Sequence, residues 1–259
     1  DALQQKERRS VRYAFVNMSG DAPIGAEALD GVTDPGLRIV AENLFAAPDI
    51  RPDARLKEYY GLASPKTFDI VSCMFAIHYF MDSPERLDAV LDNVERYIRQ
   101  GGLFIGTCLD GFAVDEAFAS AKSDVLQGLD GEGNVVWKLT KRYDGRFGKV
   151  ADQNFGRQID VYLETINKVI PEFLVDFNLL TDKLASRGIV PLARPELKKL
   201  GLSHSSGLFG DVYRELDLKA LSASRDTRLA HNARLVSMMT PSAREFSSLN
   251  RFFIFVKSS

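Results

Sequence analysis

A short segment in the first half of the chain carries side chains suited to binding a flat molecule with polar edges. Within residues 75–80, Phe75 offers an aromatic ring, His78 an imidazole and Tyr79 a phenol. Aromatic rings stack on the faces of purines, while nitrogen and oxygen atoms bind their edges. The same residue types are also common in protein cores, after strands and in half-buried positions. Residue type alone therefore leaves both a purine site and an ordinary core open.

A strand–helix–strand unit must position this segment. Residues 69–74 and 103–107 are almost wholly apolar, which is typical of parallel strands covered on both faces. Between them, Ser83 suits a helix N-cap, Pro84 suits the first helical position, and Gly101 predicts the end of the helix. The expected apolar stripe of this helix is Leu87, Val90, Leu91, Val94 and Ile98. In such sheets ligands bind at the carboxyl ends of the strands, which is where the segment lies.

The remaining pattern predicts further strands and helices on both sides of this unit. Strands are expected at residues 13–18, 135–143, 158–164 and 251–257. Helices are expected at 37–47, 54–60 and 114–129. Pro171 is expected to open another helix, whose apolar positions are Phe173, Leu174, Phe177, Leu180 and Leu184. The alternation of strands and helices predicts an α/β fold.

Composition limits the class of protein. The 259 residues are 45% hydrophobic and 26% charged, which predicts one α/β domain with a full core. The net charge of −2 means that any contact with nucleic acid must come from a local patch. Cys73 and Cys108 lie in apolar strand contexts, so we expect reduced thiols in an intracellular protein, in nucleus, cytoplasm or virion. We expect no membrane contact, because no run of eighteen apolar residues exists.

The glycine-rich turn that usually binds a nucleotide-type cofactor is missing from the pattern. Such sheets ordinarily begin with a strand, a glycine-rich turn and an acidic residue after the second strand. No G-x-G-x-x-G motif follows a predicted strand, and no apolar strand precedes residue 12. We therefore expect the N-terminal strand of the sheet to be absent from this chain.

Four blocks of sequence follow the pattern of one protein family. Residues 68–79 read Phe-Asp-Ile-Val-Ser-Cys-Met-Phe-Ala-Ile-His-Tyr. The family pattern for this block differs only at the position of Met74, where it has Gln. Residues 101–107 read Gly-Gly-Leu-Phe-Ile-Gly-Thr, and residues 171–175, after Phe155-Gly156, read Pro-Glu-Phe-Leu-Val. The last block is residues 245–257. In these blocks the chain resembles the mRNA cap guanine-N7 methyltransferases, particularly those of large DNA viruses and of eukaryotes.

The resemblance implies a class I, Rossmann-like methyltransferase sheet with helices on both faces. It implies that the protein binds S-adenosylmethionine and the GpppN end of capped RNA and methylates guanine N7. Residues 1–259 would form the C-terminal major part of one methyltransferase domain, as a fragment or continuation of a longer capping protein. The missing strand would then come from a preceding segment or another chain. The implied partners are triphosphatase and guanylyltransferase domains, or an activating subunit.

The resemblance also implies roles for individual residues. Those expected to bind the cofactor are Asp21, Ala22, Met74, Phe75 and Tyr79. Those expected to bind the cap guanine are Phe75, His78, Tyr79, Glu172 and Asn250. His78, Tyr79 and Glu172 are the residues expected to support catalysis, by fixing the guanine, and no metal ion is expected. The residues expected to guide the triphosphate or RNA are Lys138, Lys141, Arg142, Arg146 and Lys149.

Several of these residues also have simpler interpretations. By composition alone, Asp21 suits a turn or helix cap, Glu172 suits the first turn of a helix, and the basic residues suit a solvated hairpin. Met74 lacks the amide of the family's Gln, and Asn250 stands where several members carry a cap-contacting tyrosine. Two other functions stay open: a non-catalytic, structural or stimulatory methyltransferase-like subunit of a capping complex, and a methyltransferase that acts on a small molecule. His78-Tyr79 and residues 171–175 argue against the second.

Overall fold

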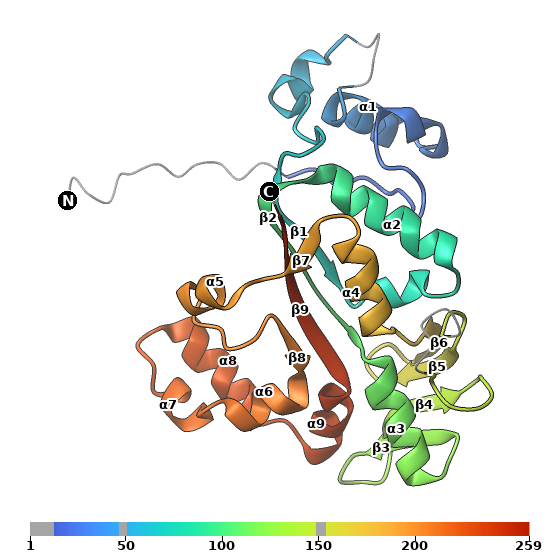
Figure 1. The fold of residues 1–259 in the computed structure, drawn as a ribbon, viewed down its shortest axis with the longest axis vertical. Helices are drawn as coiled ribbons and strands as arrows, with labels where there is room; N and C mark the ends of the chain where they lie inside the picture. The colour runs from blue at the N-terminus through green and yellow to red at the C-terminus, as the bar shows by residue number, and fades with distance from the viewer. Residues whose placement is uncertain (1–12, 47–50, 149–153, 259) are drawn as a thin grey trace.

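The computed structural model describes residues 13–46, 51–148 and 154–258 (Figure 1). The strands are β1 (Phe68–Met74), β2 (Ile98–Leu109), β3 (Val125–Leu129), β4 (Val135–Lys141), β5 (Gln158–Leu163), β6 (Lys168–Phe173), β7 (Ile189–Pro191), β8 (Ser206–Leu208) and β9 (Asn250–Lys257). The α-helices are α1 (Pro35–Leu44), α2 (Pro84–Tyr97), α3 (Gly111–Ala121), α4 (Phe177–Ala185), α5 (Arg194–Lys199), α6 (Phe209–Glu215), α7 (Leu218–Ser222), α8 (Thr227–Ser237) and α9 (Pro241–Ser248). Short 3₁₀ helices are η1 (Ala26–Gly31), η2 (Ala54–Tyr59) and η3 (Ile77–Phe80). None of these helices is long and apolar enough to cross a lipid bilayer.

The main sheet has the strand order β1-β2-β9-β7, with β8 also paired to β9. Strands β1 and β2 are parallel and joined through α2, so the predicted strand–helix–strand unit is confirmed. Strand β9 pairs antiparallel to β2 along its length and passes through the middle of the sheet in Figure 1. The predicted terminal strand at 251–257 is therefore confirmed, and the α/β class with it.

Helix α2 begins and ends close to its predicted limits. The hydroxyl of Ser83 accepts a hydrogen bond from the backbone N–H of Arg86 at 3.3 Å, and Pro84 is the first helical residue. Ile98, predicted on the helical stripe, instead opens β2, where it pairs with Phe68. Its side chain is buried, and an apolar residue just past a helix suits a strand as well as another helical turn.

The largest buried cluster lies between α2, α4 and one face of the main sheet. At its centre, Phe104 on β2 contacts Phe253 on β9, whose ring also contacts Phe255. On the opposite face, Leu103 and Ile254 are only partly buried. Strand β1 departs from the expectation of a strand covered on both faces, because most of its residues are exposed.

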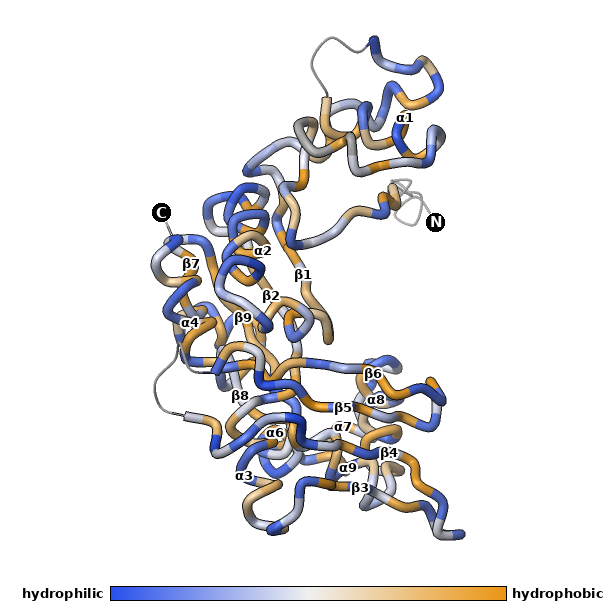
Figure 2. The backbone as a smooth tube through the Cα atoms, turned by 90° about the vertical axis from the view of Figure 1, so that its right-hand side faces the viewer, coloured by the Kyte–Doolittle hydropathy of each residue, from blue (hydrophilic) through white to orange (hydrophobic). Residues whose placement is uncertain are grey.

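A second sheet of order β3-β4-β5-β6 packs over α3 and α9 around its own apolar cluster, which includes Trp137. In Figure 2 this sheet lies at one end of the molecule and α1 at the other, with β1 and β2 between them. The two sheets meet through η3 and β6, where the candidate site lies. The predicted strands at 135–143 and 158–164 are confirmed as β4 and β5.

Three other predicted elements differ from those in the structure. Residues 13–18 pair with no strand within the described part of the chain, and Tyr13 and Phe15 are exposed. The helix predicted over 114–129 stops at Ala121, where Lys122 adopts a left-handed conformation, and its second half is strand β3. Pro171 opens no helix, because it lies within β6 opposite Asp160. An end strand tolerates proline where the missing N–H faces away from its neighbour.

Helix α4 is capped at its N-terminus by Asp176, and this cap should contribute to the stability of the protein. Its buried carboxylate accepts hydrogen bonds from the backbone N–H groups of Asn178 and Leu179, at 3.0 and 3.1 Å, and from the Asn154 amide at 2.6 Å. We expect Asp176→Ala to lower the free energy of unfolding by about 2–4 kcal/mol, because it removes a helix cap and leaves one of the two N–H groups of the buried Asn154 amide without an acceptor, the other being bound by the Gly148 carbonyl. Urea denaturation measures the effect.

Asp226→Ala is the matched control for this measurement. Asp226 caps α8 through the same two backbone bonds, but its carboxylate is exposed and no buried amide depends on it. Its loss should cost about 1 kcal/mol, the usual value for a cap alone. Equal costs for the two variants would contradict the role given to the contact between Asp176 and Asn154.

Candidate functional site

A strained turn at the carboxyl end of β1 directs the chain into the site. Phe75 has a φ of +51°, and its backbone N–H donates to the Thr107 carbonyl at 2.9 Å. A bulky residue in the left-handed region costs energy, and such residues concentrate at functional sites. The turn leads directly into η3, which carries His78 and Tyr79.

A cavity of about 380 Å³ opens beside η3 and is called here the η3–β6 pocket. It is lined by Phe75, His78, Tyr79, Leu109, Val161, Leu163, Ile166, Ile170, Glu172, Phe209, Phe246, Ser247 and Asn250. All five residues predicted to bind a guanine are therefore in one cavity, although they come from three separate parts of the chain. The apolar wall from β5, β6 and Phe209 was not predicted, although the alternation of Val161 and Leu163 gave a signal for it.

The polar edge of the η3–β6 pocket is formed by His78 and Glu172. The imidazole is 3% exposed, and neither ring nitrogen has a hydrogen-bond partner. Its Nε2 lies 3.6 Å from Oε2 of Glu172, whose side chain is 12% exposed. Glu172 reaches this position because β6 pairs it with Ile159 of β5. The two ring nitrogens of His78, buried in an apolar cavity without hydrogen-bond partners, indicate that a ligand supplies those partners.

Burial controls the ionisation of both groups. It lowers the pKa of His78 to about 4 and raises the pKa of Glu172 to about 7. The pKa of Tyr79 is raised by burial and by the nearby Glu172 carboxylate. The rings of His78 and Tyr79 meet edge to face at 4.2 Å between centroids. Near neutral pH the imidazole is therefore uncharged, while Glu172 is close to its midpoint.

Asn250 lies in the wall of the pocket, but part of its side chain is already occupied. Its amide nitrogen donates to the carbonyls of Phe246 and Ser247 at 3.1 and 3.2 Å, which closes the end of α9. Only the amide oxygen is left to meet a ligand. Binding of a guanine by Asn250 stays a prediction.

The residues predicted for the cofactor lie apart from the η3–β6 pocket, except Phe75 and Tyr79. The Asp21 carboxylate pairs with Arg86 Nε at 2.5 Å and accepts from the Ser19 hydroxyl. The Ser19 bond and Arg86 hold the pKa of Asp21 below its usual value. The Ala22 carbonyl accepts from the side chain of Asn93 at 2.8 Å, so this loop is fixed to α2.

The basic residues predicted to guide RNA are largely occupied by neighbouring groups. Arg142 pairs with Asp160 at 2.6 Å, and Arg146 pairs with Asp115 and Glu116 at 2.6 and 2.9 Å. The Lys141 ammonium donates to the Gly145 carbonyl and lies 4.5 Å from the centre of the Tyr143 ring. Lys149 lies outside the described residues. These contacts favour the structural interpretation of Lys141, Arg142 and Arg146.

Comparison with known proteins gives a family match over most of the central region. Residues 41–192 match the model of the mRNA (guanine-N(7))-methyltransferase domain. The mRNA cap guanine-N(7) methyltransferase of Candida albicans is 33% identical over 116 residues, 43% of this chain and 24% of that protein. Its counterpart from Meyerozyma guilliermondii is 27% identical over 122 residues, 47% of this chain and 21% of that protein. The chain thus covers less than a third of these relatives' length.

Solved structures show only distant similarity. A putative S-adenosylmethionine dependent methyltransferase from Listeria monocytogenes aligns with 76% of this chain and 64% of its own, at 12% identity and a TM-score of 0.35. The CcbJ methyltransferase from Streptomyces caelestis aligns with 75% of this chain and 59% of its own, at 9% identity and a TM-score of 0.38.

Proposed function

Because the chain belongs to the mRNA (guanine-N(7))-methyltransferase family, which its residues 41–192 match, we propose that it methylates N7 of the cap guanine of GpppN-RNA. The methyl donor in this proposal is S-adenosylmethionine. One observation carries the assignment of the guanine site: the polar edge of the η3–β6 pocket, where the unpartnered ring nitrogens of His78 lie beside the Glu172 carboxylate.

Guanine suits the polar edge formed by His78 and Glu172 better than adenine does. Its N1 and N2 groups are both donors, and the ionised carboxylate of Glu172 can accept from them. Adenine offers an unprotonated N1 at the same place, so it would leave the carboxylate desolvated and unpaired. Phe75 and Tyr79 supply aromatic surface, and Ile166 and Ile170 supply apolar surface, for the faces of the base.

The reaction requires that the guanine be held in the correct orientation, and it requires no general base. Guanine N7 carries a free lone pair, so no proton has to be removed before it attacks. S-adenosylmethionine, when bound, supplies a methyl group on a positively charged sulfur. The task of His78, Tyr79 and Glu172 is to hold the guanine in one orientation, with N7 directed at that methyl group for in-line displacement. The uncharged imidazole adds no positive charge against the sulfonium.

The described residues fit one side of a cofactor site. Met74 and Phe75 are about half exposed at the carboxyl end of β1, where such sheets bind ligands, and they offer an apolar wall. The free lone pairs of the Asp21 carboxylate can accept from an adenine amino group. Met74 offers no amide, and its sulfur instead accepts from the Thr107 hydroxyl at 3.7 Å. We propose Asp21, Ala22, Met74, Phe75 and Tyr79 as the cofactor contacts of this chain.

The proposal also includes the longer protein of which this chain would be a part, and its partners. The chain would be the larger, C-terminal part of a methyltransferase domain within a longer capping protein that acts inside the cell. Triphosphatase and guanylyltransferase domains, or an activating subunit, are the partners proposed for it, because RNA must carry a GpppN end before its guanine can be methylated.

Methyl transfer to defined RNA ends tests the proposal. The full-length protein, given radiolabelled S-adenosylmethionine and GpppG-capped RNA, should release labelled m7GpppG after nuclease digestion. RNA with an ApppG end and RNA already carrying m7GpppG are the controls and should take up no label. If no RNA is methylated although S-adenosylhomocysteine raises the melting temperature, the proposal fails and the non-catalytic subunit is favoured.

A further inference from the structure

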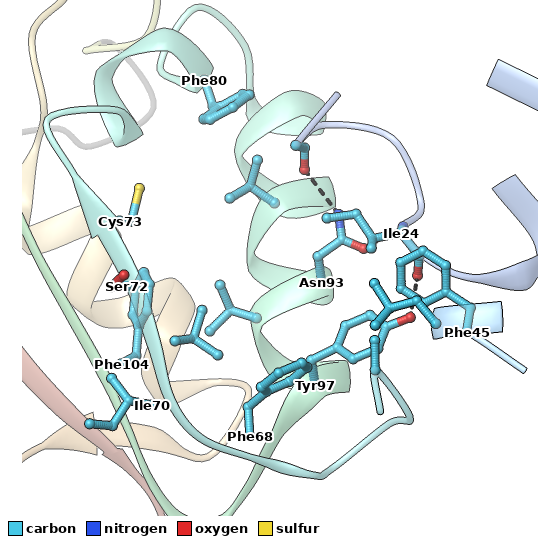
Figure 3. A pocket seen from close by; sticks show the side chains of 16 residues that line it. Ile24, Phe45, Phe68, Ile70, Ser72, Cys73, Phe80, Asn93, Tyr97 and Phe104 are labelled. Atoms are coloured by element: carbon cyan, nitrogen blue, oxygen red, sulfur yellow. Dashed lines mark hydrogen bonds between the residues drawn. The ribbon is translucent and has the colours of Figure 1, made fainter. Parts of the chain in front are cut away.

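The loop that carries Asp21 is attached to α2 through its main chain. Asn93 donates to the carbonyls of Gly20 and Ala22, at 2.9 and 2.8 Å, and accepts from the N–H of Ile24 at 2.9 Å. Figure 3 shows Asn93 reaching from α2 to this segment, beside a cavity of about 430 Å³ that Gly20, Ile24 and Asn93 help to line. Because a cavity lies beside the loop, a few specific contacts rather than close packing must hold it. These bonds fix the backbone of the loop but leave the orientation of the Asp21 side chain to other residues.

The side chain of Asp21 is oriented by Arg86 on α2. Arg86 Nε donates to Oδ2 of Asp21 at 2.5 Å, and its Nη1 donates to Oδ2 of Asp82 at 2.7 Å. The guanidinium also lies 5.6 Å from the centre of the Phe80 ring. The same ring packs against the loop, because a Cβ at Gly20 would lie 3.0 Å from it. With contacts to two carboxylates and a ring, the guanidinium holds Asp21 in one orientation.

The carboxylate that Arg86 holds can still accept a bond from a ligand. Its Oδ1 accepts from the Ser19 hydroxyl and its Oδ2 from Arg86, and the Asp21 side chain is 19% exposed. Each carboxylate oxygen has two lone pairs, so each keeps one acceptor position. A lysine could not fully replace Arg86, since an ammonium lacks the planar set of donors that binds two carboxylates in a fixed geometry. Asp21 is therefore a partly shielded acceptor whose direction Arg86 sets.

We propose that Arg86 is a positioning residue for cofactor selection: it holds the Asp21 carboxylate where that group accepts from the adenine amino group of S-adenosylmethionine. Arg86 acts through Asp21 and does not touch the cofactor, so its role rests on the cofactor contact proposed above for Asp21. Through Asp82, Arg86 also fixes the loop to the chain just after η3, which carries His78 and Tyr79. Loss of Arg86 should therefore reduce the selectivity for adenine, rather than only weaken binding in general.

Two ligands that differ at the adenine amino group test this role. S-inosylhomocysteine carries a carbonyl oxygen where S-adenosylhomocysteine carries the amino group. In calorimetric titrations, the full-length wild type should bind S-adenosylhomocysteine at least about 10-fold more tightly, because the carbonyl oxygen would face the Asp21 carboxylate. Arg86→Gln should reduce this preference to about threefold or less. If Arg86 were only a structural ion pair, the variant would lose affinity for both ligands equally and keep the preference, which would overturn the proposal.

Arg99→Gln is the matched control for Arg86→Gln. Arg99 pairs with Asp69 at 2.6 Å, and its side chain is 47% exposed, close to the 40% of Arg86. It lies at the start of β2, away from the loop that carries Asp21, so both affinities should stay within about twofold of the wild type. Melting temperatures check that the variants fold. If Arg86→Gln does not fold, Arg86→Lys, which keeps the charge but not the planar donors, takes its place, and an unchanged preference in that variant would overturn the proposal.

A double variant shows whether Arg86 acts through Asp21. Asp21→Asn should also reduce the preference to about threefold or less, because an amide can donate to the carbonyl oxygen as well as accept from the amino group. Adding Arg86→Gln to Asp21→Asn should reduce it no further, whereas additive losses would mean that Arg86 acts independently and would overturn the proposal.

The same titrations separate the role of Arg86 from the proposed function. If the wild type binds neither ligand, or binds both equally, the adenine contact of Asp21 is wrong and the role of Arg86 with it. If Asp21→Asn loses the preference but Arg86→Gln keeps it, the cofactor contact stands and only the role of Arg86 is wrong. None of these results requires RNA to be methylated, so a catalytically inactive protein would give the same answer.

Discussion

Glu172→Gln in the full-length protein should lower kcat/KM for GpppN-capped RNA by on the order of 10²–10³-fold. The amide would place a donor against the donors of guanine N1 and N2, and Glu172 lies in a pocket that shields it from water. Because the side chains are nearly equal in size, the apolar packing of the pocket should be preserved. Steady-state methylation kinetics with capped RNA measure the loss, and circular dichroism checks the fold.

Glu164→Gln is the matched control for this variant. Glu164 carries the same carboxylate just beyond the end of β5, but it is exposed and does not line the η3–β6 pocket. Its kinetics should stay within about twofold of the wild type, since isolated surface charges contribute little. If Glu172→Gln were as active as Glu164→Gln, the guanine-binding role of Glu172 would be wrong.

The affinity for a cap analogue should rise with pH between about pH 6 and 8. Burial raises the pKa of Glu172 to about 7, and only the ionised carboxylate accepts from both guanine donors. Well below that pKa the affinity should fall roughly tenfold per pH unit. The other ionisable groups that line the pocket, His78 and Tyr79, stay uncharged in this range, because burial lowers the pKa of the first and raises that of the second.

Calorimetric titration of GpppG into the full-length protein at several pH values measures this dependence. The Glu172→Gln variant should bind more weakly, with an affinity that changes little over the same range. A wild-type affinity that is independent of pH, or that falls as pH rises, would show that Glu172 does not bind the guanine through its ionised form.

The same carboxyl group should make the ligand-free protein less stable at high pH. Its pKa is about 7 in the folded protein and 4.5 as the model value, so the unfolded chain releases the proton first as pH rises. The stabilising contribution is therefore complete below pH 4.5 and is lost between pH 4.5 and 7, by about 3 kcal/mol in total. Glu172→Gln has no such group and should be more stable than the wild type at pH 8.

Urea unfolding of the two proteins at pH 5 and pH 8 tests this effect. The stability difference in favour of Glu172→Gln should grow from pH 5 to pH 8. A difference that is the same at both pH values would mean that the carboxyl group is not desolvated in the folded protein. Together with the kinetics, the result would identify Glu172 as a group retained for binding at a cost in stability.

The local elements of the fold could be predicted because their causes are local. The capping of α2 by Ser83, its apolar stripe and the two strands beside it depend on neighbouring residues, and all are in the structure except that Ile98 of the stripe belongs to β2. The helix predicted from Pro171 was wrong for a non-local reason. Pairing with β5 outweighs the helical spacing of the residues that follow, since it forms a complete ladder from Lys168 to Phe173.

The sequence by itself determined the α/β class, the family and the residue types of the proposed guanine site, because these follow from local periodicity and from motifs read along the chain. Only the tertiary structure decided that Glu172 lies on a strand facing His78, that the carboxylate is largely shielded from water, and that the ring nitrogens of His78 are buried without partners. It also decided that β1 is exposed. These facts depend on which distant segments pack together, and burial, pKa and free sheet edges result from that packing rather than from any one residue.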